Sequence, residues 1–86
     1  MTQEIKSKIY ETFKESDHKR AIDILGSVTL QHVMTNSQSN LNNAWLSIIY
    51  LSKGSLGELK KLVTLAKVDF RDVIYWTILE KEKEQK

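Results

Sequence analysis

Two histidines and one pair of closely spaced aspartates are the residues of this chain whose types best suit catalysis. The chain has no cysteine, so it has no thiolate for nucleophilic attack or zinc binding. His32 lies among apolar residues, and histidine titrates near neutral pH, which suits a general base. However, no carboxylate lies within eight residues of His32 along the chain. We therefore expect a partly buried histidine with a hydrogen-bond partner.

Asp69 and Asp72 have a spacing that suits either a pair of catalytic carboxylates or the start of a helix. A metal site built on carboxylates needs more oxygen ligands than these two residues supply. Phe70 and Val73 accompany them in a pattern typical of a core helix. The sequence therefore favours capping, with Val68 and Val73 at the positions of a hydrophobic staple.

A basic group at the start of the second predicted helix is a candidate anion contact. Free N–H groups at a helix start attract anions, and the side chains that would assist them are His18, Lys19 and Arg20. The acidic neighbours Glu15 and Asp23 favour a solvated charge cluster instead.

A second basic group lies in the carboxyl-terminal half and would suit weak nucleic-acid binding: Lys60, Lys61, Lys67 and Arg71. The formal net charge of +2 is too small to imply a polyanionic partner. A helix-turn-helix motif does not fit, because only Lys67 and Val68 separate the two predicted helices and the motif needs a turn of about three or four residues. Nucleic-acid binding is therefore the alternative interpretation.

Residues 62–76 include the run AKVDFRDV at 66–73. This segment resembles the carboxyl-terminal part of small, uncharacterised helical bacterial proteins. The resemblance implies a bacterial cytosolic protein and no particular activity.

The elements that position these side chains are predicted to be helices. The chain has no proline, and its apolar residues recur at spacings of three and four. This pattern predicts one all-α domain over 1–86, a bundle with the third helix at its centre and helices over 2–15, 17–34, 39–53, 55–67 and 69–84. The charged residues 80–86 are expected to form a frayed tail.

Capping residues mark most of these boundaries. Thr2 and Asp17 are predicted N-caps, and Gly54 suits the left-handed residue that ends a helix. Ser55 and Glu58 have the spacing of a capping box. The second helix has a glycine at 26, which either costs stability within one helix or breaks it, with residue 27 as a new N-cap.

Residues 24–52 contain no formally charged side chain, which predicts that the fold or a partner covers them. The expected core is Leu25, Trp45, Ile48, Ile49, Leu59, Leu62, Val63, Phe70, Val73 and Ile74. In the helix over 69–84, Thr77 and Ile78 share the spacing of Phe70 and Val73 and are expected on the same buried face. The helix over 39–53 is apolar around most of its circumference, so a homodimer is a further possibility. Its candidate interface residues are Leu46, Tyr50 and Leu51.

The functional expectation is a small, non-enzymatic protein-interaction module in the cytoplasm. The longest apolar run, 44–51, is much shorter than the roughly twenty residues of a membrane span. No phosphate-binding loop, nucleophile elbow or metal-ligand motif is present, so we expect neither a cofactor nor a metal. The amino terminus lacks the continuous apolar segment of a signal peptide.

Overall fold

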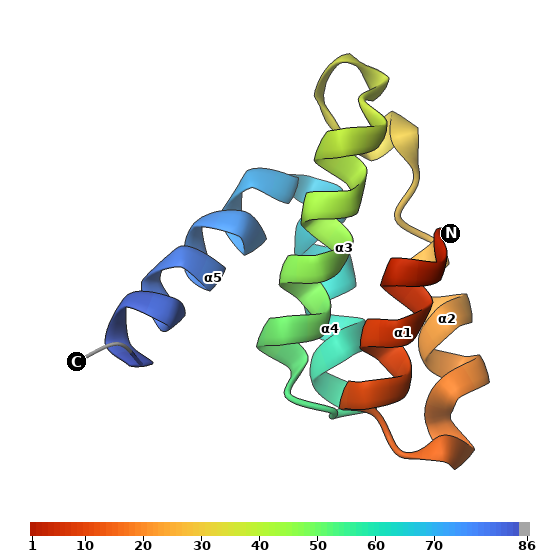
Figure 1. Cartoon of the computed structure of the whole chain (residues 1–86). Coiled ribbons are helices and arrows are strands. Elements are labelled where there is room, and N and C mark those ends of the chain that lie inside the picture. Colours follow the sequence, from red (N-terminus) through yellow and green to blue (C-terminus); the bar gives the residue numbers. More distant parts are fainter. Residues whose placement is uncertain (85–86) are drawn as a thin grey trace.

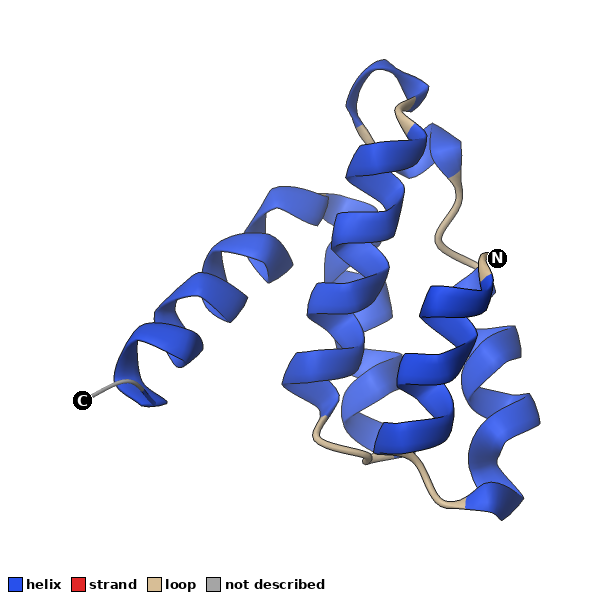
Figure 2. Cartoon of the chain, in the orientation of Figure 1, coloured by secondary structure: helices blue, strands red, loops and turns tan. Residues whose placement is uncertain are grey.

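The computed structural model describes residues 1–84, which form five α-helices and three short 3₁₀ helices with no strand among them (Figures 1 and 2). The α-helices are α1 (Gln3–Thr12), α2 (His18–Gly26), α3 (Gln38–Ser52), α4 (Leu56–Val68) and α5 (Phe70–Glu84). The 3₁₀ helices are η1 (Glu15–Asp17), η2 (Leu30–His32) and η3 (Met34–Asn36). The prediction of an all-α fold with five helices is confirmed.

Helix α3 lies at the centre of the molecule, with α1, α4 and α5 packed against it (Figure 1). All expected core residues are buried except Ile74, which is half-buried. The core also takes in residues from the first helix and the α2–α3 connection, among them Ile5, Ile9, Phe13 and Val28. The central position predicted for the third helix is therefore confirmed.

The first helix begins as predicted and ends earlier. The hydroxyl oxygen of Thr2 accepts a hydrogen bond from the Ile5 N–H at 3.3 Å. The predicted end at residue 15 is wrong, because Phe13 already has an extended backbone and is buried. Turning Phe13 inward takes the chain out of the helix and into η1.

The predicted second helix over 17–34 is wrong in its second half. Helix α2 ends at Gly26, and Ser27 follows as its C-cap, with the Ser27 hydroxyl donating to the Ile24 carbonyl oxygen at 2.7 Å. Ser27 therefore does not start a new helix. The predicted cap by the Asp17 side chain is also wrong, because Asp17 has helical backbone angles and makes no side-chain cap bond.

The junction between α3 and α4 has the predicted left-handed residue and half of the predicted capping box. Gly54 has φ +82°, and a Cβ atom there would lie 2.6 Å from the Thr12 carbonyl oxygen, so glycine is required. The Ser55 hydroxyl accepts from the Glu58 N–H at 3.3 Å. The Ser55 N–H, however, donates to the Ser52 carbonyl oxygen at 3.0 Å and not to Glu58.

The junction between α4 and α5 is capped by Asp69, as predicted. Its carboxylate accepts hydrogen bonds from the Arg71 backbone N–H at 3.0 Å and from two guanidinium nitrogens at 3.0 and 2.9 Å. The predicted hydrophobic staple is wrong, because Val68 is 84% exposed while Val73 is fully buried. The extended backbone of Asp69 at this junction leaves the Val68 side chain facing solvent.

Residues 80–84 are helical, in agreement with the predicted helix over 69–84, while residues 85 and 86 lie outside the described residues. Fraying of the charged end 80–86 stays a prediction. The Tyr50 hydroxyl donates to the Glu84 carboxylate, and Lys53 pairs with Glu80 at 4.0 Å. These contacts join the end of α5 to α3. None of the described helices combines the length and apolar character needed to cross a membrane.

Candidate functional site

The largest exposed apolar side chains on α5 lie around its middle. Tyr75 is 59% exposed, Ile78 is 51% exposed and Leu79 is 36% exposed. Helix α5 lies at an angle to α3 (Figure 1), and no described residue after Thr77 is buried. The middle of α5 therefore presents apolar side chains to solvent.

A groove lies between α3 and α5, and we call it the α3–α5 groove. It has a volume of about 240 Å³ and is lined by Asn43, Leu46, Ser47, Ile74, Thr77, Ile78 and Lys81. A neighbouring hollow of about 300 Å³ shares Leu46 and Lys81 with it and extends toward α1, where the lining residues are Glu4, Lys8, Glu11 and Thr12. The combined surface has an apolar floor and charged edges.

Tyr50 determines the electrostatics at one edge of this surface. Its hydroxyl donates to the Glu84 carboxylate, and the Lys81 Nζ atom lies 5.1 Å from the centre of its ring. The hydrogen bond to Glu84, with some desolvation, raises the pKa of Tyr50 to about 12. Tyr50 is therefore a neutral hydrogen-bond donor at physiological pH, and the cation over its ring helps to hold Lys81 at the groove.

The three candidate interface residues do not lie together. Leu46 and Tyr50 line the groove and its extension, whereas Leu51 lines a separate hollow with Trp76 and Leu79. All three candidates are half-buried. The exposed Ile78 was missed, because helical periodicity alone counted it among the buried residues of its helix.

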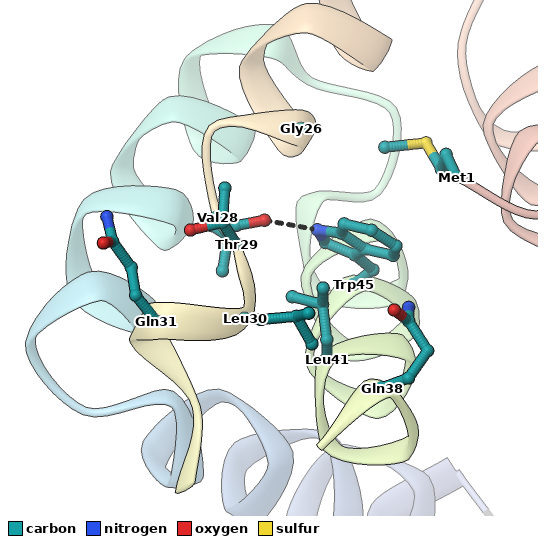
Figure 3. Close-up of a pocket in the computed structure, with 9 residues that line it drawn as sticks. All are labelled: Met1, Gly26, Val28, Thr29, Leu30, Gln31, Gln38, Leu41 and Trp45. Atoms are coloured by element: carbon teal, nitrogen blue, oxygen red, sulfur yellow. Dashed lines mark hydrogen bonds between the residues drawn. The ribbon is translucent and has the colours of Figure 1, made fainter. Parts of the chain in front are cut away.

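A second apolar groove, of about 420 Å³, lies beside Trp45 (Figure 3). The Trp45 indole N–H donates to the carbonyl oxygens of Leu25 and Val28, at 3.0 and 3.1 Å. This side chain therefore satisfies backbone groups at the end of α2. The lining contains no acidic or basic side chain: Met1, Gly26, Val28, Thr29, Leu30, Gln31, Gln38, Leu41 and Trp45.

The three candidate anion-binding side chains, His18, Lys19 and Arg20, do not form a common site. The His18 Nε2 atom donates to the Phe13 carbonyl oxygen at 2.8 Å, and the His18 ring lies 4.9 Å from the Tyr10 ring. Lys19 and Arg20 are exposed. Only His18 of the three thus has a defined contact, and this contact is with the chain itself.

His32 and Asp69 have structural partners. The His32 Nδ1 atom accepts a hydrogen bond from the Thr29 N–H at 3.0 Å, which completes a capping box around η2. The Arg71 guanidinium lowers the pKa of Asp69 chiefly through its side-chain hydrogen bonds. Within residues 1–84, no group of three or more acidic, histidine or cysteine residues is placed to hold a metal ion.

The basic side chains of the nucleic-acid alternative differ in their surroundings. Lys60, Lys61 and Lys67 are exposed, whereas Arg71 forms a bidentate pair with Asp69 at 2.9 Å. This pair neutralises part of the positive charge of the group.

Comparisons of the chain with protein-family models, with curated proteins and with solved structures gave no match. The resemblance of residues 62–76 to small helical bacterial proteins therefore stays a prediction.

Proposed function

We propose that this protein is a small, non-enzymatic interaction module that binds an amphipathic helix of a protein partner along α5 and the α3–α5 groove. The observation that carries this proposal is the exposure of Tyr75 and Ile78, at 59% and 51%, beside the apolar floor of that groove. Large apolar side chains that gather beside a groove are typical of protein-binding surfaces.

The edges of the surface specify the chemistry of the partner helix. Its apolar stripe would cover Leu46, Ile74 and Ile78, which line the groove. An acidic side chain on one edge of the helix would meet Lys81, and a basic side chain on the other edge would meet Glu4 or Glu11 across the extension toward α1. The proposed partner is therefore an amphipathic helix with opposite charges on its two edges.

A photo-reactive residue in the groove tests this proposal in the cells that make the protein. Benzoylphenylalanine at Asn43, which is exposed and lines the groove, should form a covalent adduct on illumination. The same residue at Lys61, on the exposed side of α4, is the control and should give no adduct. Equal adducts at both positions, or none at Asn43, would contradict the proposal.

The captured partner is then purified and its affinity for the purified chain is measured. Ile78→Asp should weaken binding by about tenfold or more, because it places a charge on the apolar contact. Val68→Asp introduces the same change at a more exposed residue outside the groove and should leave the affinity within about twofold. Circular dichroism confirms that both variants fold. Similar affinities for the two variants would contradict the assignment of the surface.

A further inference from the structure

One line of exposed side chains runs along α5 and consists of Arg71, Tyr75, Ile78 and Glu82, which we call the α5 stripe. Their spacings of four, three and four residues are those of a heptad seam, along which one helix packs against another. Ile78 also lines the α3–α5 groove, so the stripe borders that groove.

The charges of two α5 stripes are complementary when the two helices run antiparallel. One end holds Arg71, whose positive charge Asp69 partly neutralises, the middle is apolar, and the other end holds the carboxylate of Glu82. In an antiparallel pair of α5 helices, Arg71 would lie opposite the second copy's Glu82, and Tyr75 opposite the second copy's Ile78. A parallel pair would instead place like charges opposite each other at both ends, which is unfavourable. The charges therefore favour a two-fold antiparallel arrangement.

The Arg71 side chain is held in place by Asp69. Its Nε and Nη2 atoms donate to the two carboxylate oxygens of Asp69, at 3.0 and 2.9 Å. A guanidinium has about five N–H donors, so about three stay available for a second carboxylate. Because Asp69 fixes the side chain, less conformational entropy is lost on binding. Glu82 forms no salt bridge with another residue of the described range 1–84.

We propose that the partner helix is α5 of a second copy of this chain, packed antiparallel along the α5 stripe about a two-fold axis. This inference rests on the proposed function, since it takes the same helix as the contact surface. It places a second copy on the α5 stripe, which meets the α3–α5 groove at Ile78, and it specifies the register of the two helices.

Charge reversal at the two ends of the stripe tests this register by sedimentation of the purified chain at low salt, where surface charges are least screened. The unchanged chain should form a dimer with twice its 10.0 kDa mass as its concentration rises. Arg71→Glu and Glu82→Arg should each weaken the dimer by about tenfold or more, since each variant places like charges at both ends. An equimolar mixture of the two variants should dimerise again, because every pair in the mixed dimer is opposite in charge.

Arg71→Glu also removes the ion pair with Asp69 within the chain, so a loss of dimer by this variant alone does not separate a folding defect from a lost contact. Dimerisation of the mixture shows that both variants are folded. Asp23→Arg makes the same charge change on the exposed surface of α2 and should dimerise like the unchanged chain. An unchanged chain that stays monomeric up to about 1 mM overturns the inference. So does a mixture that dimerises no better than its components.

The adduct at Asn43 distinguishes this outcome from failure of the proposed function. If the purified chain is a monomer but the adduct contains another protein, self-association is wrong and the proposed function stands. If Asn43 gives no adduct, the proposed function itself fails.

Discussion

The segment 27–37 and helix α3 both lack charged side chains, yet they lie in opposite surroundings. In α3, Ala44 and Ile48 are fully buried, and a charge at either position would lose its hydration. In the segment, Met34 is 57% exposed, so burial does not explain the absence of charge there. Coverage by the fold is therefore found along the buried face of α3 and at Val28 and Val33 of the segment, whereas coverage of Met34 by a partner stays a prediction.

Hydrogen bonding to the backbone accounts for many of the side chains in the segment. It has no long helix to pair its peptide groups, so short polar side chains bond to them instead. The Ser27 hydroxyl donates to the Ile24 carbonyl oxygen, the Thr35 hydroxyl to the Met34 carbonyl oxygen at 2.6 Å, and His32 accepts from the Thr29 N–H. An uncharged stretch can thus indicate either a buried helix or an exposed turn region.

A lysine placed in each region gives the largest expected difference. Ile48→Lys should reduce the free energy of unfolding by more than about 4 kcal/mol, because it buries an unpaired charge at the centre of α3. Met34→Lys should change it by less than about 0.5 kcal/mol, because the side chain is exposed. Urea denaturation measures both. Similar losses for the two variants would mean that the segment is as tightly packed as α3.

The indole of Trp45 joins the two regions and should have the next largest effect. Trp45→Phe removes the donor shared by the Leu25 and Val28 carbonyl oxygens, so we expect a loss of about 2–3 kcal/mol. Trp76→Phe is the matched control, because Trp76 is only half-buried, and it should cost about 1 kcal/mol. Thermal unfolding of the two variants compares these values, and equal shifts would contradict the role assigned to the indole N–H.

Loss of the η2 capping box should have a smaller effect that is confined to the segment. His32→Ala leaves the Thr29 N–H without its acceptor and should cost about 1 kcal/mol. Hydrogen exchange should show faster exchange at the Thr29 amide with little change in α3. Gln31→Ala, at an exposed neighbour, should leave this amide unchanged. Faster exchange throughout α3 would show that the segment and the helix do not open separately.

The smallest effect concerns Tyr50 and appears at high pH. The hydrogen bond to Glu84 raises the folded-state pKa to about 12 from 10.0, so the stability it contributes is fully present below pH 10. That contribution should decline as the pH rises from 10 to about 12, because the unfolded chain ionises first. The stability of Tyr50→Phe should decline less over this range. Parallel declines in the two proteins would show that the hydrogen bond has no effect on folding.

Helix boundaries were predictable where capping residues mark them. The starts at Thr2, Ser55 and Asp69 and the end at Gly54 lie within about one or two residues of the observed limits. The second helix was predicted too long, because Val28 and Val33 continue a helical spacing although an irregular backbone buries them. Periodicity identifies apolar positions and does not show which backbone conformation buries them.

The candidate site was predictable in part for a related reason. Leu46 and Tyr50 were identified from the apolar circumference of their helix, and both line the groove or its extension. Ile78 was expected to be buried, since it shares the spacing of Phe70 and Val73, yet it is exposed. Spacing shows which residues share a helix face, whereas the angle of α5 to α3 depends on packing between distant segments.

The two tryptophans lie in different surroundings, so their fluorescence can report separately on two parts of the structure. Trp45 is enclosed and bonded to carbonyl groups, so its fluorescence should be emitted at shorter wavelength than that of the half-buried Trp76 on α5. In Trp76→Phe, the remaining light reports on the junction between α2 and α3. In Trp45→Phe, the remaining fluorescence reports on the middle of α5, where an added quencher would distinguish a free helix from a covered one.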